Sequence, residues 1–180
     1  MPFVFAAIPH AEPISLRARV TVIAVATTIA AALLRDSENI ARSSSENLRS
    51  NVLGYLVPVV SLLFLFPTAP ELGMTVLAVL AFGDGSATVG GLLLRGQSLP
   101  WNHEKTWAGL ISFLLFSAPL AFLAFYANAS PTPELTRAAI VTGAAAVAGA
   151  VAETLPLKVN DNVSVGAAAT LTSLTIYFCF

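Results

Sequence analysis

The chain has 180 residues, of which 56% are hydrophobic and only 11% are charged, and its mean hydropathy is +0.79. A soluble domain of this length needs a polar surface that so few polar residues cannot build, so the composition excludes an ordinary soluble protein. The formal net charge of −1 and the lack of a basic tract argue against a nucleic-acid partner. The single cysteine, Cys179, excludes a disulfide framework.

Apolar runs of roughly 17–25 residues are typical of membrane-spanning helices. In chain order, such runs predict six spans of uneven length, at residues 16–34, 52–66, 71–82, 106–126, 135–152 and 163–180. The first is expected to be a retained helix rather than a cleaved signal peptide, because residues 33–36 form a poor cleavage site. We therefore expect an all-α fold, a polytopic transmembrane helix bundle of about six spans, with residues 1–180 in a single integral membrane domain.

The fifth predicted span is rich in alanine and glycine. Small residues such as Gly143 and Gly149 would let neighbouring helix backbones approach closely, as they do in helices packed inside a membrane bundle. A simple compositional bias toward alanine explains the same stretch. The sequence leaves these two interpretations open.

Six spans place the connections alternately on two sides of the membrane. One side collects residues 35–51, 83–105 and 153–162, and it holds six of the nine basic residues: Arg35, Arg42, Arg49, Arg95, Lys105 and Lys158. The positive-inside rule therefore predicts that this side is cytoplasmic. Most acidic residues fall in the same connections, so nearly all groups capable of chemistry are expected at one face of the membrane.

The first polar stretch, Gly83-Asp84-Gly85, is expected to close the short third span. A carboxylate such as Asp84 at the end of an apolar helix is costly unless it is paired or bound to a cation. The flanking glycines lack side-chain bulk, so a phosphate or a metal ion can approach the backbone. An ordinary Gly-Asp-Gly turn accounts for the same residues.

The second polar stretch is LPWNHEKTWAG, residues 99–109. Asn102 is a good helix N-cap, which would place Lys105 in the first turn of the fourth span. A basic residue there opposes the helix dipole, so we expect a bound anion that is held by the ammonium and the free N–H groups together. The alternative is a lysine that reaches lipid headgroups between two interfacial tryptophans, Trp101 and Trp107.

The third polar stretch, ETLPLKVNDN, covers residues 153–162 between the last two spans. Asp161 taken alone is explained as a cap of the sixth span. Beside Asp84 on the same face, Asp161 and Glu153 become candidate ligands of Mg²⁺, because this ion takes oxygen ligands, typically one or two carboxylates with substrate phosphates.

Together, GDGSATVGG, LPWNHEKTWAG and ETLPLKVNDNVSVG resemble the polyprenol kinase family, which includes phytol, farnesol and dolichol kinases and is related to phosphatidate cytidylyltransferases. The resemblance runs from roughly residue 46 to the C-terminus and is dense only in these three stretches. It departs at residues 49–53, Arg-Ser-Asn-Val-Leu, where related sequences usually carry an Arg-Lys-x-x-His pattern.

The resemblance implies a Mg²⁺-dependent kinase, embedded in the membrane, that transfers a phosphoryl group from CTP or another nucleoside triphosphate to an isoprenoid alcohol. On this basis we expect the catalytic residues to be Asp84, Lys105 and Glu104, and the metal ligands to be Asp84, Asp161 and Glu153. The expected nucleotide- and phosphate-binding residues are Gly83, Gly85, Asn102, Thr106, Gly109, Lys158 and Asn162. The expected partners are the nucleotide, the lipid alcohol, the bilayer, and a second copy of the chain or another subunit that completes the bundle.

Two other functions stay open. An enzyme that forms a CDP-lipid needs the same ion and similar phosphate contacts, although such enzymes typically carry a Ser-Pro-Lys-Lys-Thr-like stretch where this chain has residues 101–106. A transporter or a non-catalytic membrane subunit would also be apolar. Transport is disfavoured because the polar groups lie at the ends of the predicted spans rather than in their middles.

Overall fold

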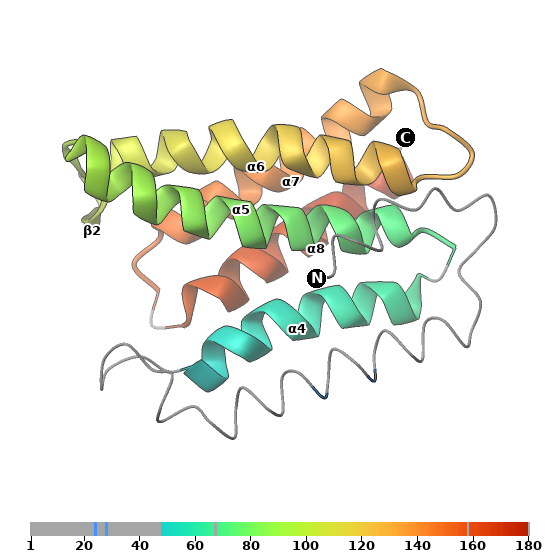
Figure 1. The fold of residues 1–180 in the computed structure, drawn as a ribbon, viewed down its shortest axis with the longest axis horizontal. Coiled ribbons are helices and arrows are strands. Elements are labelled where there is room, and N and C mark those ends of the chain that lie inside the picture. The colour runs from blue at the N-terminus through green and yellow to red at the C-terminus, as the bar shows by residue number, and fades with distance from the viewer. Residues whose placement is uncertain (1–23, 25–27, 29–47, 67, 158, 180) are drawn as a thin grey trace.

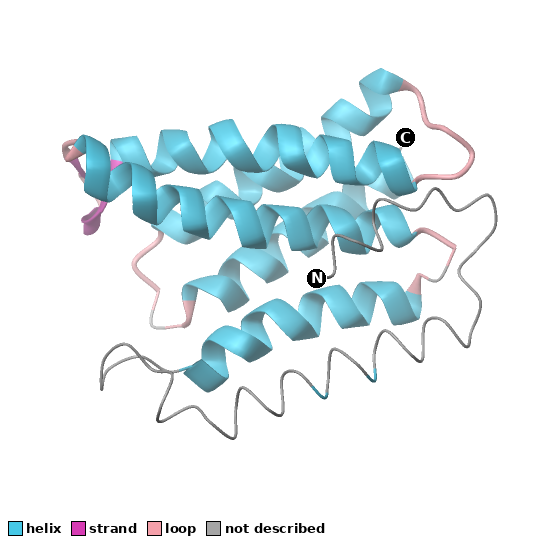
Figure 2. Cartoon of the chain, in the orientation of Figure 1, coloured by secondary structure: helices cyan, strands magenta, loops and turns pink. Residues whose placement is uncertain are grey.

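The computed structural model describes residues 48–66, 68–157 and 159–179, together with residues 24 and 28. In this part of the chain the main helices are α4 (Leu48–Leu65), α5 (Pro70–Leu94), α6 (Trp107–Asn128), α7 (Leu135–Thr154) and α8 (Asp161–Cys179). Figures 1 and 2 show them side by side as one up-and-down bundle. A short antiparallel hairpin, β1 (Ser98–Leu99) and β2 (Asn102–Thr106), connects α5 to α6. Helix α5 packs against each of the other four.

Four of these helices, α5 to α8, are long and apolar enough to cross a membrane. Helix α4 carries a shorter apolar segment, Leu53–Leu65. The prediction of an all-α bundle is therefore confirmed for the described residues, with the small hairpin as an addition, and the four helices of spanning length suggest an integral membrane protein. The predicted first span lies outside the described residues except for positions 24 and 28, so the count of about six spans stays a prediction.

The predicted end of the third span at Gly83-Asp84-Gly85 is wrong, because α5 continues through these residues to Leu94. At about 1.5 Å per residue, its 25 residues extend over about 37 Å, more than the ~30 Å of a bilayer core. A glycine inside a helix costs about 1 kcal/mol relative to alanine. The packing of α5 must therefore compensate for its glycines.

That compensation is a close contact between α5 and α6. A Cβ atom on Gly83 would lie 2.3 Å from the Phe113 ring, and one on Gly90 would lie 2.0 Å from the Ser112 hydroxyl. Between them, the Ser86 hydroxyl donates a hydrogen bond to the Ser112 carbonyl at 3.1 Å. These α5 residues lie on one helix face, and small residues on a shared face let two helix backbones approach each other. Gly83, which was expected to end the helix, is thus part of a helix–helix interface together with Gly90.

Small residues also bring α7 against its neighbours. A Cβ atom on Gly149 would lie 2.8 Å from a methyl group of Val79 on α5 and 3.3 Å from one of Val165 on α8. The predicted packing role of Gly149 is confirmed. The same prediction for Gly143 is wrong, because a Cβ atom there would meet nothing within 4 Å.

The described connections gather at two ends of the bundle (Figure 1). The hairpin lies at one end with the connection between α7 and α8 and the start of α4, and we call this the hairpin end. The connection between α6 and α7 lies at the other end. This arrangement agrees with the predicted grouping of the polar connections, whereas the cytoplasmic orientation of the hairpin end stays a prediction.

Candidate functional site

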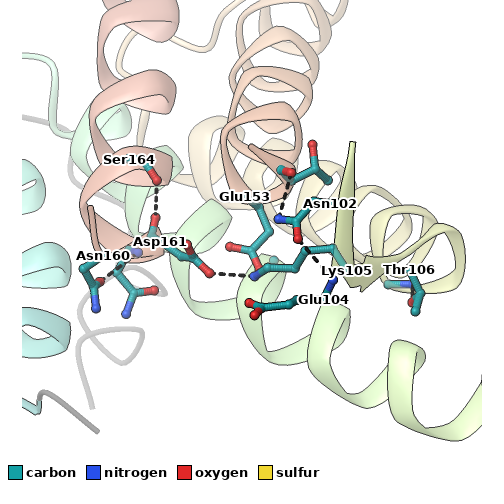
Figure 3. Close-up of polar contacts among 12 residues, drawn as sticks. Asn102, Glu104, Lys105, Thr106, Glu153, Asn160, Asp161 and Ser164 are labelled. Carbon is teal, nitrogen blue, oxygen red and sulfur yellow. Dashed lines mark hydrogen bonds and ion pairs between the residues drawn. The ribbon is translucent and has the colours of Figure 1, made fainter. Parts of the chain in front are cut away.

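Lys105 lies at the centre of a charged cluster at the hairpin end (Figure 3). It belongs to β2, and its Nζ donates hydrogen bonds to Glu153 Oε1 near the end of α7 and, at 2.6 Å, to Asp161 Oδ2 at the start of α8. The side chain of Glu153 is only 6% exposed, and that of Lys105 is 27% exposed. The second and third polar stretches of the sequence therefore meet at one partly buried ammonium.

The surroundings of Lys105 keep it charged. Burial by itself lowers the pKa of an ammonium, because loss of water disfavours the charged form. The hydrogen bonds and negative charges of Asp161 and Glu153 outweigh this effect and raise the Lys105 pKa above its ordinary value of 10.5. At neutral pH Lys105 therefore acts as a fixed cation and not as a proton acceptor.

Asp84 approaches the same cluster from inside the bundle. It interacts electrostatically with Lys105 and Asp161, and its carboxyl group lies within hydrogen-bonding reach of the Tyr55 hydroxyl on α4. That hydroxyl also donates to the Leu80 carbonyl at 3.2 Å. Sequence reasoning missed Tyr55, because one tyrosine in an apolar span carries no pattern that separates it from a packing residue.

Asn102 fastens the hairpin to α7 and does not cap α6 as predicted. Its Nδ2 donates to the Thr154 carbonyl at 3.1 Å, and its Oδ1 accepts the Glu104 N–H at 3.1 Å (Figure 3). Both ends of the amide are therefore used within the protein. The hydrogen bond to Thr154 holds β2 at the end of α7, where Lys105 reaches Glu153.

The N-cap of α6 is Thr106, whose hydroxyl oxygen accepts the Gly109 N–H at 3.1 Å. Lys105 consequently precedes the helix and does not lie in its first turn, which corrects the prediction. The reason is local: Thr106 is extended, and its hydroxyl satisfies one of the free N–H groups at the helix start. The Lys105 ammonium is directed at α7 and α8, so it does not share a phosphate site with the start of α6 in this arrangement.

The remaining predicted phosphate-binding residues have different surroundings. Gly83 is buried in the contact with α6, whereas Gly85 is exposed and has open space beside it. Asn162 is only 7% exposed and packs closely against Gly54 of α4. Lys158 lies outside the described residues. The structure therefore brings together the charged residues of the predicted site more closely than its glycines and amides.

A cleft of about 370 Å³ opens beside Lys105 and Asp161. It is lined by residues 101–105 of the hairpin, by residues 155–157 of the connection between α7 and α8, and by Asp161. Glu104 is exposed on the wall of this cleft and stands outside the buried cluster. Small-molecule sites typically occupy about 300–1,000 Å³. The cleft is therefore large enough to admit a soluble ligand to the charged cluster.

The carboxylates have the chemistry to bind Mg²⁺. Glu153 Oε2 is buried and has no hydrogen-bond partner among the described residues, which leaves one oxygen able to accept a ligand. The predicted set of three protein ligands is not assembled, because the described part of the chain contains no group of three acidic, histidine or cysteine residues arranged to hold a metal. One or two carboxylates with substrate phosphates is the usual Mg²⁺ arrangement, and Glu153 and Asp161 fit it.

Comparison with known proteins bears on what this cluster does. The chain is 31% identical over 145 residues to Phytol kinase 1, chloroplastic, of Arabidopsis thaliana, which covers 76% of this chain and 45% of that protein. Its similarity to phytol kinases is not confined to one species. It is 30% identical over 141 residues to Probable phytol kinase 2, chloroplastic, of Glycine max and to Probable phytol kinase, chloroplastic, of Zea mays, covering 73% of this chain in both cases.

These matches support a relationship to kinases of isoprenoid alcohols and so support the resemblance seen in the three polar stretches. The chain spans less than half the length of these relatives, with 47% of the Glycine max protein and 45% of the Zea mays protein covered. No protein-family model and no solved structure matches the chain.

Proposed function

We propose that the chain is a membrane-embedded kinase that phosphorylates the hydroxyl of an isoprenoid alcohol such as phytol, farnesol or a polyprenol. The observation that carries this proposal is the cluster of Lys105, Glu153, Asp161 and Asp84 at one end of an apolar bundle, in a chain similar to phytol kinases. Four helices of spanning length support a multi-pass membrane location. The bias of basic residues supports a cytoplasmic active face, where nucleotide is available.

Asp84 is the proposed acceptor of the hydroxyl proton. It lies on α5 close to Lys105, within the apolar bundle that would hold the isoprenoid chain, whereas Glu104 is exposed on the cleft wall. In the transfer, the alcohol oxygen forms a bond to the γ-phosphorus, and the bond between that phosphorus and the β–γ bridging oxygen breaks. The hydroxyl proton passes to the Asp84 carboxylate, and the nucleoside diphosphate leaves.

Lys105 is the proposed cation for the transferred phosphoryl group. Phosphoryl transfer depends mainly on positioning and on neutralising negative charge, which suits an ammonium whose pKa is raised. Glu153 and Asp161 would hold Mg²⁺ on the phosphates of the nucleotide, where the ion neutralises charge. The donor is proposed to be CTP, as the family resemblance implies.

The proposal is tested with purified protein in detergent, Mg²⁺, labelled CTP or ATP, and phytol, farnesol or longer prenols. We expect labelled lipid phosphate and a loss of about 10²–10⁴-fold in turnover for Asp84→Asn, the proposed base. Lys105→Met should also lose turnover, whereas the control Glu134→Gln removes an exposed carboxylate at the other end of α7 and should not. Absence of lipid phosphate with every nucleotide and alcohol would refute the kinase.

The same reaction separates the alternatives. Release of CDP identifies a kinase, whereas release of pyrophosphate identifies an enzyme that forms a CDP-lipid. A transporter or a non-catalytic subunit would form neither product. Completion of the bundle by a second copy of the chain stays a prediction, which cross-linking in membranes would test.

A further inference from the structure

The lining of the cleft beside Lys105 is chemically mixed. Lys105, Glu104 and Asp161 provide charge. Trp101 and the Leu-Pro-Leu segment at residues 155–157 provide apolar surface, which we call the apolar wall. Apolar groups do not stabilise a phosphate, so the apolar wall suits an apolar part of a ligand whose charged part lies at Lys105.

Trp101 is both accessible and held in place. Its side chain is 47% exposed, and its ring contacts Trp107 edge-on, with 5.6 Å between the ring centroids. Two hydrogen bonds hold the hairpin in place. The Asn102 side-chain amide donates to the Thr154 carbonyl, and the Trp107 backbone N–H donates to the Gln97 carbonyl at 3.0 Å. The indole therefore needs little ordering before it contacts a ligand, which favours binding.

The position of the apolar wall distinguishes between the two substrates of the proposed kinase. The wall is formed by connecting segments at the hairpin end, and Leu155 and Leu157 on it are 40% and 50% exposed. Asp84, the proposed acceptor site, lies instead on a helix of the apolar bundle. An isoprenoid chain would reach Asp84 between the helices, so the cleft is left for the soluble substrate.

We propose that Trp101 and residues 155–157 form the subsite for the nucleobase of the phosphoryl donor, with the base stacked on Trp101. This inference rests on the proposed kinase function, which puts the phosphates at Lys105. Stacking on an aromatic side chain accepts any base, because every base has a π-face. The subsite therefore adds affinity for nucleotides over bare phosphates.

The chain offers a direct probe, since Trp101 and Trp107 are its only tryptophans. In the Trp107→Phe protein, the fluorescence of Trp101 should change when CTP is added with Mg²⁺. Inorganic tripolyphosphate, which carries phosphates but no base, should cause no such change. Equilibrium dialysis should show that Trp101→Ala weakens CTP binding by about 5- to 150-fold and leaves tripolyphosphate binding unaltered. Trp101→Phe, which keeps an aromatic ring, should retain most of the affinity.

Leu157→Ser is a second variant in case Trp101→Ala does not fold, because Leu157 is half-exposed in a connection. It should raise the KM for CTP with little change in kcat. Two results would overturn the subsite: unchanged CTP affinity in the Trp101 and Leu157 variants, or a change of Trp101 fluorescence on adding farnesol that CTP does not reverse. Lipid phosphate would still form in either case, whereas failure of the kinase proposal abolishes it for the unmodified protein.

Discussion

Gly83→Ala should destabilise the bundle, although Gly85→Ala on the other side of Asp84 should not. A Cβ atom on Gly83 would lie 2.3, 2.6 and 2.7 Å from three ring carbons of Phe113, whereas ordinary contacts begin at 3.4 Å. Phe113 is 0% exposed, so its ring is enclosed by protein. A Cβ atom on Gly85 would meet nothing within 4 Å.

The magnitude follows from two opposing effects. Overpacking a filled core costs about 1–3 kcal/mol, and the short distances at Gly83 place the cost in the upper half of that range. Alanine recovers up to about 1 kcal/mol over glycine within a helix. The free energy of unfolding should therefore fall by about 1–3 kcal/mol in Gly83→Ala, and should stay unchanged or rise by up to about 1 kcal/mol in Gly85→Ala.

Unfolding by SDS in mixed detergent micelles, followed by circular dichroism, measures this difference. Phe113→Leu combined with Gly83→Ala should recover part of the loss in a double-mutant cycle, because the smaller side chain makes room. If both alanine variants unfold at the same SDS fraction as the unmodified protein, the close contact of α5 with α6 is wrong. That result is the one expected of an open Gly-Asp-Gly loop.

Three further predictions concern polar groups. Lys105→Met should lower the free energy of unfolding by about 1–3 kcal/mol, because Glu153 is 6% exposed and loses its charged hydrogen-bond donor. The loss should stay below that of a fully buried ion pair, because the Lys105 side chain is 27% exposed. Adding Glu153→Gln should restore part of this loss in the same SDS titration, and no restoration would contradict the ion pair. Because the Lys105 pKa is raised, the part of the stability that depends on the charge of Lys105 is fully present below pH 10.5 and is lost only as the pH rises beyond it. Unfolding curves that show a Lys105-dependent loss as the pH rises from about 7 to 9 would rule out this account. Tyr177→Phe should cost about 1–3 kcal/mol, because Tyr177 donates at 2.8 Å to Glu71, which is 4% exposed and whose other oxygen has no hydrogen-bond partner within the described part of the chain. Thr175→Val, an exposed change on the same helix, is the control, and equal thermal stability of the two variants would contradict the prediction.

Local signals in the sequence were ambiguous where two structures satisfy the same residues. Asn102 and Thr106 are both good helix N-cap residues, and the register of the hairpin decides that Thr106 is the N-cap of α6. Asn102 then bonds to Thr154, which lies 52 positions further along the chain. No neighbouring residue in the sequence indicates that contact.

The glycines beside Asp84 are a second example of a local signal that fits two structures. Glycine is common both in turns and in close helix contacts, and only the partner surface distinguishes the two. That partner is Phe113 on the next helix. The contribution of Tyr55 could not be predicted from the sequence either, because it depends on how α4 is rotated about its axis. That rotation directs the Tyr55 hydroxyl toward Leu80 and Asp84.

Apolar runs of spanning length and short connections were enough to predict the helices and the gathering of charged connections at one end, because they force an up-and-down arrangement. It also indicated that Lys105, Glu153 and Asp161 would lie near one another. Three features required the folded arrangement: α5 continues past Asp84, the Lys105 ammonium faces α7 and α8, and a cleft opens beside it. The physical reason is that helix length and side-chain direction here depend on contacts between helices, which a linear pattern of polar and apolar residues does not contain.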